Sequence, residues 1–218
     1  MRKVLFLISC LSFLASSFAQ RSDTLSCGYD HSLQPAQIVA PSLLIVSGSI
    51  IAGSDYLHSK INVPIEQWSQ RDGHDRFEIE NFIQYVPLAT VPVLKLCGLE
   101  SRHSWRDLAS LAGGATILSF GFSQGFKYLT KEERPYGGVF NSFPSGHTMT
   151  AFWGAEILRR EYGEEYPGIA VAGYAVAAGV GCLRVYNNRH WAADILAGAG
   201  FGILSASLMY WLAPYLRF

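Results

Sequence analysis

The sequence predicts an all-α fold, a compact bundle of about six helices that is mostly embedded in a membrane. Half of its 218 residues are apolar and only 16% are charged, well below the roughly 25% of an average soluble domain. Uncharged stretches of helical length recur along the chain, and short polar clusters separate them. The mean hydropathy is only +0.18, so polar segments must dilute these apolar helices.

The predicted helices cover six ranges: 36–54, 82–98, 108–126, 148–158, 167–183 and 195–216. Five or six of them have the length needed to span a bilayer. The range 82–98 is interrupted by two prolines and a lysine. The range 148–158 contains Glu156, which should face protein or water rather than lipid. Between the first two helices, residues 55–81 are polar with interspersed aromatic residues, a composition suited to the water interface.

The N-terminal residues have the pattern of a secretory signal. Arg2 and Lys3 precede the apolar run 4–14, and Ser17-Phe18-Ala19 provides the small residues required before a cleavage site. We therefore predict a signal peptide over residues 1–19 and one domain over residues 20–218. An uncleaved anchor helix is the alternative.

The charge balance and the cysteines exclude several classes of protein. The 17 basic and 17 acidic residues cancel, whereas binding to nucleic acid needs a basic surplus. Three cysteines remain after residue 19 without C-x-x-C spacing, which indicates neither a disulfide framework nor a zinc site. Cys97 and Cys182 lie in apolar runs, and we expect both in the core. Gly121 and Gly125 have the spacing that lets two helices approach closely.

The first polar cluster follows the helix predicted to end at residue 126. If that helix continues for two turns, Lys127 and Arg134 share one face, and Pro135 marks its end. Two cations on one face suit a phosphate or a sulfate. A solvated charged face is the alternative.

The second cluster is Pro144-Ser145-Gly146-His147, immediately before a predicted helix. A helix N-terminus offers free N–H groups and partial positive charge, and Gly146 lets an anion approach the backbone. Ser145 adds a hydroxyl donor, and His147 can hold and deliver a proton near neutral pH. An ordinary N-cap explains Ser145 but does not require His147.

The third cluster runs from Arg184 to Asp194. His190 and Asp194 are four residues apart, so on a helix they are neighbours. The carboxylate can accept the N–H of one ring nitrogen and leave the other nitrogen with a free lone pair. This arrangement predicts an oriented nucleophile or base, with Arg184 as a third cation nearby. A purely structural His–Asp pair is the alternative.

The three clusters together resemble a known signature. The pattern K-x6-R-P, then P-S-G-H, then R-x5-H-x3-D is similar to that of the type 2 phosphatidic acid phosphatase (PAP2) superfamily. This superfamily includes lipid phosphatases, soluble bacterial acid phosphatases, glucose-6-phosphatase and vanadium haloperoxidases. The resemblance covers residues 127–194 and the flanking helices. Leu183 departs from it, because the family usually has Ser there, which puts a secondary hydrogen bond in doubt.

The resemblance implies a role for each matching residue. It implies that the phosphate oxygens are bound by Lys127, Arg134, Ser145, Gly146 and Arg184. It implies that His190, oriented by Asp194, attacks phosphorus to form a phosphohistidine, and that His147 protonates the leaving group. It implies neither a metal ion nor a cofactor. The remaining histidines, His31, His58, His74 and His103, are expected in exposed loops.

The positions of the clusters suggest the substrate class. They lie at the ends of apolar helices, where a lipid head group would lie. We therefore prefer a membrane lipid phosphate over a soluble ester as the substrate. The short chain and segment 55–81 look like the lipid A phosphatase branch of small bacterial membrane enzymes. The alternatives are undecaprenyl pyrophosphate or phosphatidylglycerol phosphate phosphatase, a soluble periplasmic acid phosphatase, a vanadium haloperoxidase and a non-catalytic lipid binder.

The expected location is the bacterial inner membrane, with the site facing the periplasm. A site on that face requires residues 36–54 to dip into the membrane or lie along it rather than cross it. A peripheral or soluble periplasmic form is the alternative. Nothing in the sequence indicates an oligomeric state.

Overall fold

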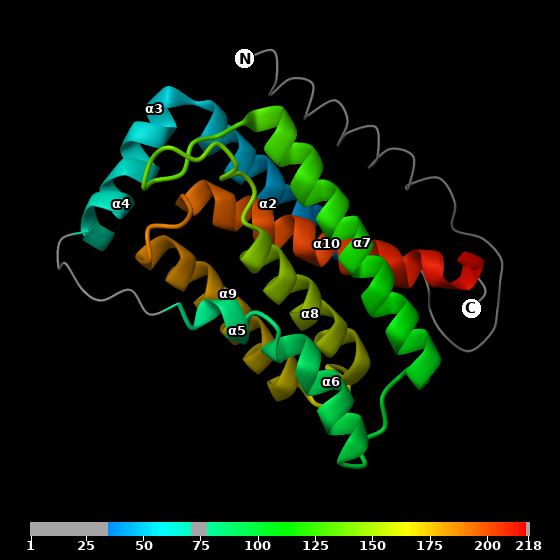
Figure 1. The fold of residues 1–218 in the computed structure, drawn as a ribbon. Coiled ribbons are helices and arrows are strands. Elements are labelled where there is room, and N and C mark those ends of the chain that lie inside the picture. Colours follow the sequence, from blue (N-terminus) through cyan, green and yellow to red (C-terminus); the bar gives the residue numbers. More distant parts are fainter. Residues whose placement is uncertain (1–34, 71–77, 217–218) are drawn as a thin grey trace.

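The computed structural model describes residues 35–70 and 78–216, and every regular element in them is helical, as predicted (Figure 1). The elements in chain order are α2 (Pro35–Gly53), α3 (Asp55–Leu57), the π-helical η1 (His58–Asn62), α4 (Val63–Gln70), α5 (Glu80–Ile83), α6 (Val86–Leu96), α7 (Trp105–Thr130), α8 (Gly146–Tyr162), α9 (Pro167–Tyr186) and α10 (Ala192–Leu216). The predicted signal peptide lies outside the described residues.

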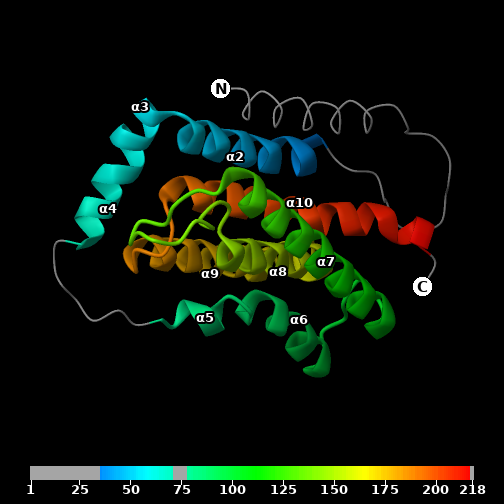
Figure 2. The same ribbon diagram turned by 45° about the horizontal axis from the view of Figure 1, so that its top comes forward.

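Helix α10 lies at the centre of the bundle. It packs against α2 on one side and against α8 on the other, and α7 crosses over it (Figures 1 and 2). Helix α8 in turn contacts α9 and α6. Helices α3 and α4 with η1 extend from the end of α2 beyond the bundle (Figure 2).

Glycines on α10 allow its neighbours to approach closely. A Cβ atom at Gly200 would lie 2.5 Å from Pro41 O of α2, and one at Gly198 would lie 2.7 Å from Ser145 O before α8. The expected contact through Gly121 and Gly125 is wrong, because a Cβ at either position meets nothing within 4 Å. Close approach is used where α10 meets α2 and α8, and on α7 it occurs at Gly114, where a Cβ would collide with the Met209 side chain of α10.

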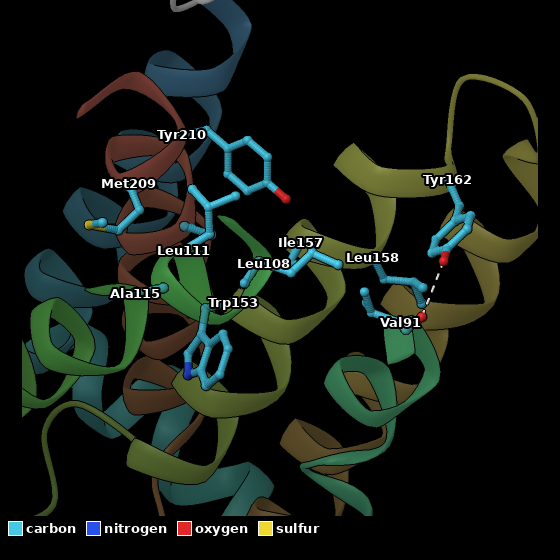
Figure 3. Packing of buried hydrophobic residues seen from close by; sticks show 11 residues of the cluster. Val91, Leu108, Leu111, Ala115, Trp153, Ile157, Leu158, Tyr162, Met209 and Tyr210 are labelled. Carbon is cyan, nitrogen blue, oxygen red and sulfur yellow. Dashed lines mark hydrogen bonds between the residues drawn. The ribbon is translucent and has the colours of Figure 1, made fainter. Parts of the chain in front are cut away.

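A large apolar core joins α6, α7, α8 and α10 (Figure 3). Trp153 of α8 and Leu111 of α7 are buried in it. The Tyr162 hydroxyl donates a hydrogen bond of 3.2 Å to Val91 O, which satisfies the buried polar atom of this ring. A second cluster around Ile45, Met149 and Phe201 joins α2, α8 and α10 nearer the other end of the bundle.

Glu156 on α8 faces protein, as predicted. It is 2% exposed and accepts hydrogen bonds from Arg159, Arg160 and Tyr174. These partners compensate the desolvation of a buried carboxylate.

Several helix boundaries differ from the predicted ones. The range predicted as one helix over 82–98 forms α5 and α6, separated by a turn at Gln84–Tyr85. Pro87 lies in the first turn of α6, where its missing N–H costs nothing. The polar segment 55–81, for which no helix was predicted, is helical over most of its described part.

Three described helices are long and apolar enough to cross a membrane: α2, α9 and α10. This supports a membrane protein but is fewer than the five or six spans expected. Helix α6 has only 11 residues, and α7 is not among the three. Helix α2 lies alongside α10 (Figure 2), and both are candidate spans. The expectation that residues 36–54 dip into the membrane or lie along it stays a prediction, and the candidate span supports a crossing α2 as the alternative.

Four residues outside the polar clusters are not where we expected them. Cys97 and Cys182 are exposed rather than in the core. His58 lies in η1 with its ring edge against Trp191, at 4.7 Å between centroids. His103 is half-buried, and its Nδ1 lies 2.8 Å from Glu161 Oε1. His31 and His74 lie outside the described residues.

Candidate active site

The three polar clusters meet at one end of the bundle. The antiparallel course of the helices brings the C-terminal ends of α7 and α9 together with the N-terminal ends of α8 and α10 (Figure 1). Residues up to 67 positions apart in the sequence therefore line one region. The loop from 131 to 145 crosses this end and contributes Arg134 and Ser142.

His190 and Asp194 form a buried pair. His190 is 2% exposed, and its Nδ1–H donates to Asp194 Oδ2 at 3.1 Å. This hydrogen bond places the free lone pair on Nε2, as the spacing predicted. Only Asp194 is helical, because α10 begins at Ala192. Burial lowers the pKa of His190 to about 4, so its ring is neutral at pH 7.

Two further donors hold the Asp194 carboxylate. The Ser142 hydroxyl donates to Oδ2 at 2.5 Å, and the Trp191 N–H donates to the same oxygen at 3.0 Å. The Ser142 hydroxyl also lies 3.4 Å from His190 Nδ1. A carboxylate held by three donors has little rotational freedom, so the imidazole ring is fixed as well. The sequence analysis did not identify Ser142.

Lys127 and Arg134 converge on Asn141. Lys127 Nζ donates to Asn141 O, and Arg134 Nε donates to Asn141 Oδ1 at 2.8 Å. They do not share a helix face, because α7 ends at Thr130 and Lys131 adopts a left-handed conformation with φ 48°. The prediction of two extra helical turns is wrong, but the loop returns Arg134 to the same place. Burial, with Arg134 nearby, lowers the pKa of Lys127 to about 8.

Arg184 forms a buried ion pair that the sequence analysis missed. Its Nη1 lies 3.2 Å from Glu80 Oε1, and both side chains are almost fully buried. Asn187 Nδ2 donates to the same oxygen at 2.9 Å. Arg184 Nε is buried without a hydrogen-bond partner. The guanidinium is thus anchored through Nη1, and its Nε–H is an unpaired donor.

Ser145, Gly146 and His147 begin helix α8 as predicted. Ser145 is the N-cap, and its hydroxyl oxygen accepts a hydrogen bond from Thr148 N. A Cβ at Gly146 would meet only Ser123 Oγ, at 3.8 Å, so the backbone here is open to an anion. His147 Nε2 lies 2.8 Å from Asn81 Oδ1 and donates to it. Burial, together with Arg184, lowers the pKa of His147 to about 3.

Within residues 78–81, Glu80 and Asn81 hold two groups of the site in place, and Glu78 forms a pair at its rim. Glu80 pairs with Arg184, Asn81 binds His147, and Glu78 forms an exposed ion pair with Arg189 at the rim. The sequence analysis placed this segment at the water interface only. One signal could have identified it: a carboxylate that leads into an apolar run requires a buried cation as its partner.

Glu132 is a further acid near this region. Burial and the negative charge of Asp194 raise its pKa well above its usual range, so it is protonated at neutral pH. Its backbone oxygen accepts a hydrogen bond from Ser142 N. No group of three or more His, Cys, Asp and Glu side chains suited to a metal occurs in residues 35–70 and 78–216.

Comparisons with known proteins identify the family. A family profile described as the PAP2 superfamily matches residues 108–218, a range that includes every predicted site residue. The chain belongs to the PAP2 superfamily. It is 43% identical over 138 residues to the lipid A 1-phosphatase of Porphyromonas gingivalis, a match that covers 62% of this chain and 31% of that protein.

A second relative is more distant. The chain is 35% identical over 83 residues to the bacitracin transport permease protein BcrC of Bacillus licheniformis, which is 37% of each chain. The matches thus span about a third of the length of each relative.

Two solved structures have the same fold. LpxE of Aquifex aeolicus aligns with a TM-score of 0.52 at 20% identity, over 68% of this chain and 93% of that one. A PAP2-type phosphatidylglycerolphosphate phosphatase from Bacillus subtilis aligns with a TM-score of 0.54 at 21% identity, over 82% and 98%.

Proposed function

We propose that this protein is a membrane lipid phosphatase that removes phosphate from a lipid head group through a phosphohistidine intermediate. The buried His190–Asp194 pair beside Lys127, Arg134 and Arg184 is the observation that carries the proposal. It combines an oriented, neutral nucleophile with fixed positive charge for the phosphate oxygens.

In the first step, His190 Nε2 attacks phosphorus and the bond from phosphorus to the lipid oxygen breaks. Asp194 stabilises the positive charge that develops on the ring, because it already accepts the Nδ1 proton. The three cations, Ser145 and the Gly146 N–H stabilise charge on the equatorial oxygens. Arg184 Nε, buried and without a partner, is one donor available to them.

His147 supplies the proton to the leaving oxygen. Its Nε2 donates to Asn81 Oδ1 in the structure, so the leaving oxygen must displace Asn81 to take the proton from this nitrogen. A bound phosphate raises the pKa of His147 by placing negative charge between the surrounding cations. Water then attacks the phosphohistidine, His147 takes its proton, the P–N bond breaks and inorganic phosphate leaves.

We favour lipid A phosphate as the substrate. The likeness to the lipid A 1-phosphatase of Porphyromonas gingivalis is the strongest support. Three candidate spanning helices favour a lipid substrate over a soluble ester. Undecaprenyl pyrophosphate and phosphatidylglycerol phosphate are the substrates to compare with it.

We further propose that the site faces the periplasm. Helix α2 ends at Gly53 and helix α6 begins at Val86, both at the end of the bundle that carries the site. A reporter fused after Ser54 should therefore give a periplasmic signal, and one fused after Gly98 a cytoplasmic signal. If α2 crosses once, its first residue, Pro35, lies on the face opposite the site, and a periplasmic site is then incompatible with a signal peptide cleaved before Gln20. A cytoplasmic signal after Ser54 would overturn the periplasmic assignment.

The decisive experiment measures phosphate release by the purified protein in detergent. The panel contains lipid A, undecaprenyl pyrophosphate, phosphatidylglycerol phosphate and a soluble aryl phosphate, each with and without EDTA. We expect release from lipid A to be fastest and unaffected by EDTA. An alkaline quench with ³²P-labelled substrate should trap label on the protein, and the label should be absent in His190→Asn. His103→Gln, far from the site, is the matched control and should retain it. Full activity in His190→Asn would refute the mechanism.

A further inference from the structure

The first turn of α10 carries Asp194, and the backbone N–H groups of this turn need acceptors from outside the helical ladder. Trp191 precedes the helix and has no side-chain oxygen that could cap it. Its carbonyl oxygen accepts a hydrogen bond from Asp194 N at 3.1 Å, and Asp194 Oδ2 accepts one from Trp191 N at 3.0 Å. These bonds leave the N–H of Ala193, which is buried, in need of an acceptor.

Asn62 of η1 supplies that acceptor from the other half of the chain. Its Oδ1 accepts a hydrogen bond from Ala193 N at 3.3 Å, across 131 positions of sequence. Ala193 is the second residue of α10, a position whose N–H an N-cap side chain normally binds. Asn62 is 1% exposed, and its Nδ2 donates to His58 Nδ1 at 3.0 Å. Because an amide nitrogen can only donate, this second bond fixes which end of the amide faces Ala193.

Close packing of α2 against α10 brings η1 to this position. A Cβ atom at Gly48 of α2 would lie 2.6 Å from Ala193 O and 2.8 Å from Ala197 N. The two backbones therefore touch at the start of α10, and η1 follows α2 after the short helix α3. Residues 58–62 lie outside the range 108–218 that the family profile matches. The cap on α10 thus comes from a segment that the profile does not cover.

The backbone on both sides of Asp194 is held by other elements. Asn62 binds the N–H of Ala193 before it, and Ser145 N donates to Asp194 O at 3.1 Å. The carboxylate that orients His190 therefore projects from a peptide segment fixed by η1 on one side and by the start of α8 on the other.

A ring contact gives η1 a second connection with the site. The edge of the His58 ring lies against Trp191, at 4.7 Å between centroids. Trp191 Nε1 in turn donates to Glu133 O at 2.8 Å, in the loop from 131 to 145 that crosses the site. This contact and the Asn62 cap meet the chain at neighbouring positions just before Asp194.

We propose that Asn62 is a positioning residue for the reaction at His190. By capping the first turn of α10, it keeps Asp194 in the orientation that presents His190 Nε2 to phosphorus. This proposal rests on the proposed phosphatase function. Without the cap, the buried N–H of Ala193 has no acceptor, and the turn relieves this cost by moving Asp194. A shift of about 1 Å in a reacting group can cost two orders of magnitude in rate.

Variants of Asn62 separate this role from general stability. Asn62→Asp keeps a side-chain oxygen for Ala193 N, and His58 can donate its Nδ1–H to the other oxygen. Asn62→Leu removes the acceptor at nearly the same volume, and Asn62→Ala removes it without crowding should the leucine variant fail to fold. Ile157→Val is the control for a loss of stability alone, because Ile157 is a core residue about 16 Å along α8 from Gly146.

Each variant of the whole chain is purified in detergent and assayed on a soluble aryl phosphate below its unfolding temperature. We expect kcat to fall about tenfold in Asn62→Leu and Asn62→Ala, and to change less than about threefold in Asn62→Asp and Ile157→Val. KM should change less than about twofold in all four, because none of the three cations that bind phosphate lies on α10. An unchanged kcat in Asn62→Leu, an equal loss in Asn62→Asp, or a rise of KM alone would each overturn the proposal.

A second measurement needs no turnover. Vanadate takes a nitrogen atom as its fifth ligand and so reports whether His190 Nε2 points into the site, whereas inorganic phosphate is held by charge and hydrogen bonds alone. By calorimetry, we expect the Kd of vanadate to rise about tenfold in Asn62→Leu and that of phosphate to change less than about twofold. An unchanged Kd for vanadate would overturn the role of Asn62. Absence of aryl phosphate hydrolysis by the unmodified protein would instead refute the phosphatase function itself.

Discussion

The Glu80→Gln substitution tests how the site holds Arg184. Glu80 is fully buried, and its Oε1 accepts hydrogen bonds from Arg184 at 3.2 Å and from Asn187 at 2.9 Å. Glutamine keeps the shape and an acceptor oxygen but removes the negative charge. The buried guanidinium is then left without a counter-charge.

The size of the effect follows from the geometry. Two unit charges 3.2 Å apart attract each other by about 5 kcal/mol at an effective dielectric constant of 20, and removing one partner of a buried pair typically costs about 3–5 kcal/mol. Because Gln retains both hydrogen bonds, we expect about 2 kcal/mol. In a chain of this length that lowers Tm by about 4–8 °C.

The catalytic effect should separate kcat from KM. Arg184 is no longer held in one orientation, so its donors reach the transition state less often, and we expect kcat to fall about 10- to 100-fold. The KM for an aryl phosphate should change less than about threefold, because removal of a nearby negative charge favours binding of an anion and offsets the loss of orientation.

The assay combines thermal unfolding in detergent with steady-state kinetics on an aryl phosphate. Glu78→Gln is the matched control. It removes the same charge from an exposed side chain two positions before Glu80, so it should leave Tm and kcat nearly unchanged. If Glu80→Gln also left both unchanged, Arg184 would not depend on Glu80, and the reasoning would be refuted.

Three further predictions concern ionisation and packing. The kcat/KM should fall below about pH 4, where His190 gains a proton. Between pH 4 and pH 8 it should decline as pH rises, because His147 must take up a proton, and above about pH 8 the decline should steepen, because Lys127 loses the charge that binds phosphate. Lys127→Arg should move only this steeper limb to higher pH, and an unmoved limb would contradict the assignment. Phosphate binding at pH 6 should take up a proton, because the pKa of His147 rises from about 3 when the anion arrives; calorimetry in two buffers of different ionisation enthalpy should detect this in the unmodified protein and not in His147→Asn. Gly200→Ala places a Cβ 2.5 Å from a backbone oxygen of α2 and should destabilise the protein by about 1–3 kcal/mol in thermal unfolding. The control Gly121→Ala has open space around it and should be neutral or slightly stabilising. Equal effects of the two substitutions would argue against close contact of α2 with α10.

The candidate site was predictable to the extent that its residues lie near one another in the sequence. His190 and Asp194 are four residues apart, and the turn before α10 brings them together even though His190 is not helical. Ser145 before α8 follows from ordinary capping chemistry. Local geometry determines these contacts, so their spacing is informative without the fold.

The partners that position the site were not predictable in this way. Glu80 meets Arg184, and Asn81 meets His147, across more than 60 residues of sequence. Composition indicates that 55–81 is polar but not which of its side chains enters the bundle. The prediction for Arg134 failed for a related reason: α7 ends at Thr130, and the loop rather than a helix face returns this cation to the site.

By itself, the sequence determined the helical class, the three polar clusters and the likeness to the PAP2 superfamily, because hydrophobic run length and short spacings are properties of the local chain. The tertiary structure decided which helices meet at the site, which of them are candidate spans, and that Glu80, Asn81 and Ser142 hold the reactive groups in place. Those contacts depend on the antiparallel order around α10 and on its close approach to α2 and α8. No local pattern specifies that order, since any apolar helix can pack against any other until shape and buried charge select the partners.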